Sequence, residues 1–394
     1  MILSPRLRTF AICWIAVAAA GYLLDLLRQT RAGLTNGIGR PFGDDFINFW
    51  SGPYLAWHGR AAEIYNWEAF HAFEAGVVGL PLNLYVYAYP PTLLVLTAPL
   101  VALPYVPGLI GWLMAGWFCF YRALHVARPD RGALLLALAT PAVFINAVAG
   151  QNGTWTAALL GGGLSLLKRR PIFAGILFGL LIFKPQLGLL LPVALLAGRQ
   201  FRTVIAAAMT AAALLLASLL LVGADIWSAY FHSVAVLRQL ILDDGTGGWH
   251  RMVSVFMFAR RLGANVPAAY ATQAVVALVV AAVVALAWLR DIPAAAKNAV
   301  LVLATFFATP YLTDYDLVVG AFVVVWLAEL YPTAELPKPV VISLGLLLIA
   351  PFVAALIGNL TGFQLGPLFI APAFVMTAQI ALTKGSRPSA LMPS

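Results

Sequence analysis

The sequence predicts an all-α integral membrane protein that crosses the bilayer about a dozen times. Of its 394 residues, 62% are hydrophobic and 10% are charged, whereas about 25% of the residues of a soluble globular chain are charged. The mean hydropathy is +0.91. The apolar residues stand in long runs, such as residues 204–222, which carry no charge and are long enough to cross a ~30 Å hydrocarbon layer as a helix. These observations exclude a water-soluble fold, and the alternation typical of a membrane β-barrel is absent.

Apolar segments along the whole chain account for the expected crossings. Helices suit them because backbone polar groups in lipid must be paired within their own segment. The segments are 10–27, 92–121, 133–148, 155–167, 172–183, 187–196, 204–222, 268–288, 299–308, 317–330, 340–357 and 366–382. Because several of them are short or broken, we expect a bundle of about 10–13 transmembrane helices.

The first span is expected to be retained. Arg6 and Arg8 precede the apolar run 10–24, as in a secretory signal peptide, but no small-residue cleavage site followed by polar sequence ends that run. The two cysteines, Cys13 and Cys119, lie in separate apolar runs. They give neither a disulfide framework nor the spacing of a metal site.

Two regions of the expected bundle are interrupted. Lys184-Pro185 separates the short segments 172–183 and 187–196, which we expect to be half-depth helices rather than full crossings. The segment 92–121 is long but contains three prolines, and proline removes a backbone donor and kinks or ends a helix. These prolines are Pro99, Pro104 and Pro107.

Positive charge predicts the orientation, because cytoplasmic loops are enriched in Lys and Arg. The basic clusters fall at alternate ends of the spans, which predicts that both termini are cytoplasmic. The clusters are Arg6/Arg8, Arg122/Arg128/Arg131, Lys168/Arg169/Arg170, Arg199/Arg202, Arg290/Lys297, Lys338 and Lys384/Arg387. Arg28, Arg31 and Arg40 do not fit, because they then lie outside. The net charge of +9 suits anionic lipid headgroups and not nucleic acid, since no aromatic-interleaved basic tract accompanies it.

The polar features then gather on the outer face. We expect one integral membrane domain, residues 1–394, without a soluble domain or an internal repeat. Its first outer loop, 28–91, is expected to carry interfacial helices, and its second large outer loop is 223–266. Short polar turns at 150–153, 184–186 and 313–316 join them on this face, which therefore holds the chemistry.

The adjacent carboxylates Asp44 and Asp45 admit three interpretations. They can bind a divalent cation with their oxygens, one can act as a general base toward a hydroxyl, or Asp45 can cap the following helix. That helix, expected over 46–58, is amphipathic and rich in aromatic residues, which is typical of a helix lying in the membrane interface.

Lys184 lies inside otherwise apolar sequence, where an ionisable group is costly and therefore indicates function. It can hold a phosphate as a point charge, or it can snorkel to the surface. Asp314 and Asp316 can serve chemistry or can cap a helix. Gln151 and Asn152, between two glycines, form either a functional or a merely structural turn.

The second large loop holds a further candidate cation pair. His250 and Arg251 can clamp a phosphate, or they and the neighbouring charged residues can simply solvate a glycine-rich loop. No Ser-His-Asp spacing, zinc motif or phosphate-binding glycine-rich motif is present.

Seven short motifs, in order over roughly residues 10–330, resemble glycosyltransferase family 87 of the GT-C superfamily. They are Asp45-Phe46-Ile47-Asn48-Phe49-Trp50 with Leu55-Ala56-Trp57-His58-Gly59 and Ile64-Tyr65; Tyr89-Pro90-Pro91 with Ala98-Pro99-Leu100 and Leu103-Pro104; Gly150-Gln151-Asn152-Gly153; Arg169-Arg170-Pro171 with Ala174-Gly175; Lys184-Pro185-Gln186; Met252-Val253-Ser254-Val255; and Thr309-Pro310-Tyr311 through Asp316-Leu317.

The resemblance implies a GT-C-like helical bundle in a bacterial inner membrane. It also implies transfer of a hexose, mannose being one candidate, from a polyprenyl-phosphate donor to a lipid or glycan acceptor on the outer face. Asp45, with Asp44 beside it, takes the place of the essential acidic residue of the first outer loop. The resemblance implies no cofactor, while a divalent metal at the Asp pair stays open. Membrane lipids are the other expected partners.

The remaining site residues follow from this reading. Lys184, with Arg251 or His250, is expected to stabilise the departing lipid phosphate. The expected substrate-binding residues are Gln151, Asn152, Gln186, Asp316 and Tyr89. Two alternatives stay open: a transporter or lipid flippase, because broken helices and a buried lysine also occur there, and a non-catalytic scaffold of envelope assembly.

Overall fold

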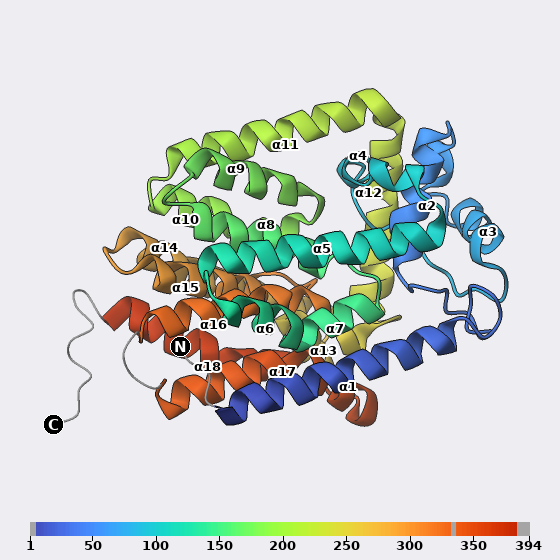
Figure 1. The fold of residues 1–394 in the computed structure, drawn as a ribbon. Helices are drawn as coiled ribbons and strands as arrows, with labels where there is room; N and C mark the ends of the chain where they lie inside the picture. The colour runs from blue at the N-terminus through green and yellow to red at the C-terminus, as the bar shows by residue number, and fades with distance from the viewer. Residues whose placement is uncertain (1–4, 332–335, 384–394) are drawn as a thin grey trace.

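The computed structural model describes residues 5–331 and 336–383, and its regular elements are helices (Figure 1), which confirms the all-α prediction. The α-helices are α1 (Pro5–Gln29), α2 (Phe46–Trp57), α3 (Trp67–Val78), α4 (Thr92–Leu96), α5 (Tyr105–Ala127), α6 (Arg131–Ala139), α7 (Pro141–Val148), α8 (Gly153–Leu166), α9 (Pro171–Leu180), α10 (Leu191–Ala197), α11 (Phe201–Val222), α12 (Ala224–Arg238), α13 (Val255–Arg261), α14 (Val266–Leu289), α15 (Ala294–Ala308), α16 (Gly320–Glu329), α17 (Lys338–Thr361) and α18 (Gly366–Thr383). Short 3-10 and π turns lie between them: η1 (Ala61–Glu63), η2 (Ala98–Ala102), η3 (Leu181–Phe183), η4 (Pro185–Gly188), η5 (Gln239–Asp243), η6 (Trp249–Arg251) and η7 (Asp314–Val319).

Six of the described helices are long and apolar enough to cross a membrane: α1, α5, α11, α14, α17 and α18. The pair α6 and α7, bent by 51° at their junction, makes a seventh candidate when it is taken as one span. The chain is therefore a polytopic membrane protein. The other expected crossings are shorter apolar helices, and α15 among them is almost entirely buried.

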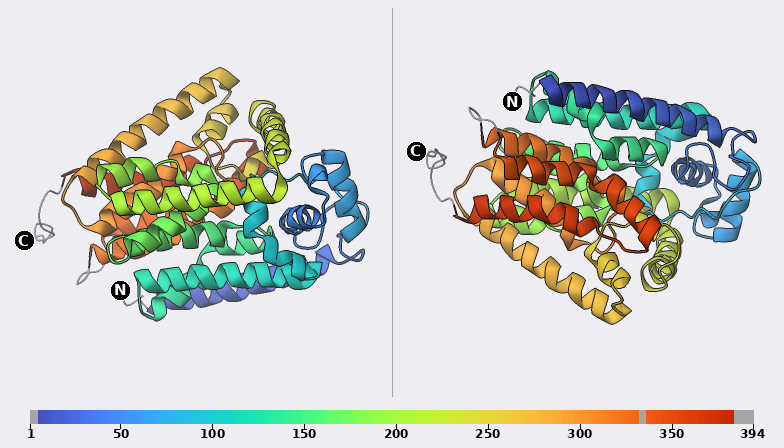
Figure 2. Two further views of the ribbon diagram at one scale, coloured as in Figure 1. Left: turned by 90° about the horizontal axis from the view of Figure 1, so that it is seen from above. Right: turned by 90° about the horizontal axis from the view of Figure 1, so that it is seen from below.

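The long helices run between two ends of the bundle. Figure 1 shows α2, α3, α4 and α12 gathered at one end, while α1 begins and α18 finishes at the other. In Figure 2, α1 and α5 lie along one flank and α14 along the opposite flank. We call the end that carries α2 and α3 the loop end, and the opposite one the basic end. The connections 128–130, 167–170, 198–200 and 290–293, which carry most of the basic clusters, lie at the basic end. The cluster Lys384/Arg387 lies outside the described residues.

The interruptions expected at proline are present. The segment 92–121 is divided into α4, η2 and α5, with Pro104 just before α5, while Pro107 lies in the first turn of α5 and does not break it. Near Lys184, α9 with η3 and η4 with α10 are two short apolar elements that meet at the lysine. Glycines let α9 approach α11 closely, because a Cβ at Gly175 would stand 2.5 Å from Thr203 O.

The helix α2 differs from its predicted setting. Most of its residues are buried against the rest of the protein, so it does not have the exposed polar face expected of an amphipathic helix. Trp50 Nε1 donates to Leu103 O at 3.0 Å, and the Phe49 ring stacks on Trp112 at 4.9 Å. The aromatic residues that looked amphipathic instead pack against η2 and α5, and this packing anchors the residue that precedes the helix, Asp45.

Candidate active site

The turn Gly150-Gln151-Asn152-Gly153, between α7 and α8, lies between two acidic segments. A Cβ at Gly150, whose φ is +59°, would collide with the backbone carbonyl of Gly43. A Cβ at Gly153 would collide with the carbonyl of Tyr315. Only glycine permits such close approaches. The turn therefore brings the loop that carries Asp44 and Asp45 together with the segment 314–316.

Asp45 faces this turn. Its Oδ2 accepts a hydrogen bond from Gln151 Nε2 at 2.8 Å, and Gln151 Oε1 accepts one from Tyr89 Oη at 3.1 Å. Asp45 stands at the N-cap position of α2, but its side chain makes no capping hydrogen bond, so the capping interpretation is wrong. Burial, and then the neighbouring Asp44, raise the pKa of Asp45 to about 6, against the opposing effects of Arg251 and Gln151.

Asp44 has different partners. Its Oδ2 accepts from Arg40 Nε at 3.0 Å and its Oδ1 accepts from Tyr85 Oη at 2.7 Å. Arg40 also pairs with Asp25 at 2.9 Å. Two carboxylates thus neutralise Arg40, which explains why this arginine departs from the charge pattern of the loops. Because both Asp44 oxygens are engaged, Asp45 is the less committed of the two carboxylates.

Lys184 is buried, with 2% of its surface exposed, and it is paired. Its Nζ donates to Asp316 Oδ1 at 2.5 Å and to Asn152 Oδ1 at 3.1 Å, and it lies 4.6 Å from the centre of the Tyr315 ring. Asp316 Oδ2 accepts in turn from the backbone N–H and hydroxyl of Thr313 at 3.1 and 2.8 Å, which completes the capping box of η7. This pairing excludes the snorkelling alternative. Asp316 both pairs with Lys184 and takes part in capping, as the N3 residue of a box whose N-cap is Thr313.

Arg251 lies over the same Tyr315 ring, with its guanidinium 5.4 Å from the ring centre. It makes two hydrogen bonds to Asp314, Nε to Oδ2 at 2.9 Å and Nη2 to Oδ1 at 3.0 Å. Burial disfavours the charged form of Arg251, but Asp314 outweighs this effect and raises the pKa of Arg251. The Arg251 side chain is 26% exposed, against 3% for the Lys184 side chain, so Arg251 is the more accessible cation.

Asn152 has an unused donor in this site. Its Oδ1 accepts from Lys184, but its Nδ2 is buried without a hydrogen-bond partner in the described part of the chain. Buried donors are rarely left unpaired. Because Gln151 holds Asp45 and Asn152 holds Lys184, two consecutive residues connect the carboxylate to the buried cation. The arrangement can accept a proton and bind an anion at neighbouring positions.

Two predicted residues are not brought into these contacts. His250 packs against α17, and a Cβ added at Gly358 would stand 3.1 Å from the Cβ of His250. The His250 ring contacts the Trp249 ring edge-on. Burial, and then Arg251, lower the pKa of His250. The side chain of Gln186, in η4, makes no hydrogen bond to the residues that the structure describes.

The site also contains residues that the sequence analysis did not single out. Arg40 and Tyr85 hold Asp44, and Tyr315 forms the surface beneath both cations. The ion pair of Arg40 and Asp44 could have been suspected from the sequence, because the two residues have opposite charges and are four positions apart. Within residues 5–331 and 336–383, no group of three or more His, Cys, Asp and Glu residues is placed to hold a metal ion.

Comparison with known families gives a match over the central part of the chain. A family described as Glycosyltransferase family 87 matches residues 87–313, which is more than half of the chain. The matched range contains Tyr89, the turn 150–153, Lys184 and Arg251, whereas Asp44 and Asp45 precede it and Asp316 follows it. No curated protein and no solved structure matches the chain.

Proposed function

Because the chain belongs to glycosyltransferase family 87 of the GT-C type, we propose that it moves a hexose from a polyprenyl-phosphate donor to a lipid or glycan acceptor. The family is one of membrane glycosyltransferases, and the GT-C type implies a lipid-linked sugar donor. Membership of a glycosyltransferase family argues against the transporter and scaffold alternatives. The proposal adds the class of donor sugar, the acceptor and the residues that act on them.

Asp45 is the proposed general base. A sugar phosphoester leaves as a phosphate that already carries charge, so the reaction needs no strong acid and needs only removal of the acceptor's hydroxyl proton. A base whose pKa lies near the working pH is largely ionised and still has enough affinity for a proton to accept one from the hydroxyl. The pKa of about 6 for Asp45 meets this condition at neutral pH, and the single hydrogen bond from Gln151 leaves the Oδ1 of Asp45 available to the acceptor.

Arg251 is the proposed contact to the donor phosphate. A guanidinium carries five N–H donors, and the pair with Asp314 uses two of them. Phosphate binding therefore does not require this ion pair to break. Lys184 is more deeply buried and uses two of its three N–H donors on Asp316 and Asn152. Its proposed role is to add positive charge behind the phosphate and to hold Asn152.

The unpaired Nδ2 of Asn152 supports a role in substrate binding, because a sugar or phosphate oxygen would supply its missing acceptor. Gln151, Tyr89 and Asp316 adjoin it and complete the proposed substrate surface. Neither His250 nor Gln186 makes a contact that supports the roles first expected for them, and both are left out of the proposed site.

The proposed topology places the loop end outside and both termini in the cytoplasm. The gathering of basic connections at the opposite end supports this orientation. The loops 28–91 and 223–266 then lie on the outer face of a bacterial inner membrane, within one domain that spans 1–394. The acceptor approaches from that side, and the polyprenyl chain stays in the bilayer.

The test is sugar transfer by purified protein in detergent, with a panel of polyprenyl-phosphate hexoses and a lipid acceptor, and with nucleotide hexoses as the comparison. We expect product only with the lipid-linked donors, and we expect Arg251→Gln to raise the KM for the donor. The control is Arg238→Gln, an exposed arginine at the same end, which should leave the KM unchanged. Transfer from nucleotide hexoses alone would overturn the proposal.

A further inference from the structure

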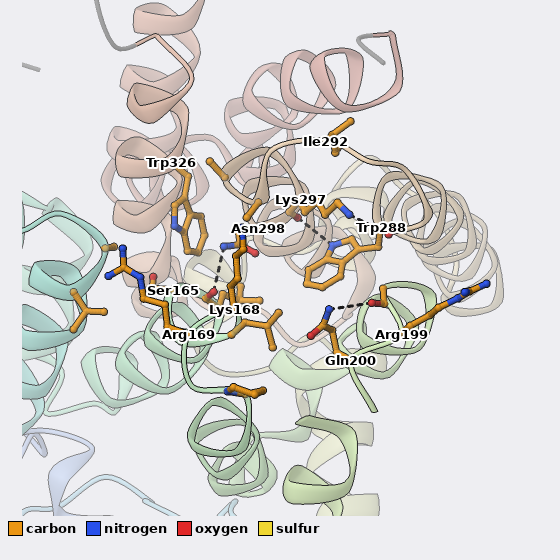
Figure 3. Close-up of a pocket in the computed structure, with 18 of the residues that line it drawn as sticks. Ser165, Lys168, Arg169, Arg199, Gln200, Trp288, Ile292, Lys297, Asn298 and Trp326 are labelled. Atoms are coloured by element: carbon orange, nitrogen blue, oxygen red, sulfur yellow. Dashed lines mark hydrogen bonds between the residues drawn. The ribbon is translucent and has the colours of Figure 1, made fainter. Parts of the chain in front are cut away.

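A cavity of about 810 Å³ lies at the basic end (Figure 3), at the opposite end of α8 from the turn 150–153. It is formed where α8, α10 and α14 end and where α9, α11 and α15 begin. Neither the family match nor the proposed reaction assigns a role to this end of the protein.

The cavity is strongly basic. Five cations line it, and Glu329 is the one carboxylate among its described lining residues. The cations are Lys168, Arg169, Arg199, Arg202 and Lys297. Within the described ranges, none of them makes an ion pair. Figure 3 shows Arg169 and Arg199 on opposite sides of the cavity, at its rim, with their guanidinium groups turned outward.

The walls of the cavity are fixed by buried side chains. Trp288 and Trp326 are 4% and 3% exposed, and Trp288 Nε1 donates to Lys297 O at 3.2 Å. Gly198 allows the indole of Trp288 to pack closely, since a Cβ there would stand 2.8 Å from the ring. Asn298, 6% exposed, adds a polar group to the wall. This packing fixes the inner walls of the cavity, whereas Lys168, Arg169, Arg199 and Arg202 are exposed at its rim.

Helix N-termini add to the positive potential. The helices α9, α11 and α15 all begin at the cavity, and the residues that precede them make no side-chain capping hydrogen bond. The first backbone N–H groups of α11 and α15 thus have neither an intrahelical acceptor nor a side-chain cap, and all three helices direct the positive end of their dipole here, although α9 begins with Pro171, which has no N–H. Such N-termini, together with arginines, bind phosphate groups.

An apolar groove adjoins the cavity and shares Pro171 and Arg202 with it. Its other lining residues include Ile172, Phe173 and Ile176, which are 61%, 47% and 37% exposed. The groove lies along the outer surface of α9, where an apolar chain can pack. A basic cavity that leads into an exposed apolar groove matches a ligand with a phosphate at one end and a hydrocarbon chain at the other.

We infer that this cavity binds one anionic phospholipid, with its phosphate among the five cations and an acyl chain in the groove along α9. Basic residues near a membrane surface strengthen binding to anionic lipid by about fivefold each. The site is separate from the candidate active site, so this inference does not depend on the proposed function.

The test is native mass spectrometry of the whole protein with phosphatidylglycerol, phosphatidylcholine and glycerol phosphate as probes. The variant Arg169→Gln/Arg199→Gln/Arg202→Gln removes three cavity cations. The matched control, Arg122→Gln/Arg131→Gln/Lys338→Gln, removes the same charge at the same end but outside the cavity.

We expect the wild type and the control to retain one phosphatidylglycerol, and the cavity variant to bind it about a hundredfold more weakly. Three outcomes would overturn the inference. Equal losses of phosphatidylglycerol binding in the two variants would mean general attraction to the basic end. Retention of phosphatidylcholine equal to that of phosphatidylglycerol would mean that the net negative charge of the lipid is not recognised. Binding of glycerol phosphate as tightly as the lipid would mean a site for soluble anions.

Discussion

The buried pair between Lys184 and Asp316 gives the sharpest prediction of stability. The perturbation is a double-mutant cycle of Lys184→Met, Asp316→Asn and the combined variant. Both residues are nearly inaccessible, at 2% and 1% exposed, and their atoms Nζ and Oδ1 lie 2.5 Å apart. Either single substitution therefore leaves the other charge buried without its partner.

The magnitude follows from that burial. Removing one member of a buried ion pair costs about 3–5 kcal/mol, because the remaining charge is desolvated and uncompensated. The double variant leaves no such charge. The amide oxygen introduced by Asp316→Asn can still accept from Thr313, so much of the capping box is kept. We expect the double variant to lose less stability than either single variant.

The assay is the free energy of unfolding in detergent, measured by SDS titration and followed by circular dichroism. The control is Arg60→Met, which breaks the exposed pair with Glu63 and should change the free energy little. If the two single losses simply add in the double variant, the residues do not act as a buried pair and the reasoning is refuted.

Three further predictions concern the site. Gly150→Ala should destabilise the protein and lower activity, because the added Cβ would collide with the Gly43 carbonyl. The control Gly247→Ala, at a similar φ of +63° but in open space, should cost only the backbone strain. Equal losses of unfolding free energy in the two variants would refute this prediction. Arg251→Lys should raise the KM for the donor about tenfold, because Lys cannot form the two-point pair with Asp314, and an unchanged KM would count against the phosphate role. Because the raised pKa of Asp45 is about 6, kcat/KM should fall about tenfold from pH 7 to pH 5 as the base becomes protonated; a flat profile across this range would contradict the assignment.

Hydropathy predicted the helical membrane bundle, because spans are set by local composition, but six or seven of the roughly dozen expected crossings are long enough to cross a membrane in the described residues. The long helices α11, α14, α17 and α18 begin and end within a few residues of the expected segments. The division at Pro104 and the two short elements around Lys184 also followed from local chemistry, since proline removes a backbone donor, although Pro351 and Pro372 lie inside α17 and α18.

The pairing of side chains could not be predicted in the same way. Asp45 and Gln151 are 106 residues apart, and Lys184 and Asp316 are 132 residues apart. A single sequence contains no signal for such contacts. The adjacent residues His250 and Arg251 illustrate the limit: one turns toward α17 and the other reaches Asp314, a difference that follows from the backbone path of η6 and not from residue type.

The setting of α2 was misjudged for a related reason. Its aromatic residues have the spacing of an interfacial helix, but that spacing equally serves a helix buried among other aromatic residues. The rings of Trp112 and Tyr105, from α5, cover the side that the pattern left open. Burial by distant segments, and not the local pattern, decides between the two settings.

The most direct test of the central claim, that Asp45 is the base, is the single-turnover rate of sugar transfer by Asp45→Asn on enzyme saturated with donor. The account predicts a rate about 10²–10⁴-fold below that of the wild type, with the affinity for the donor unchanged. A folded Asp45→Asn variant that binds the donor and transfers the sugar at the wild-type rate would contradict it.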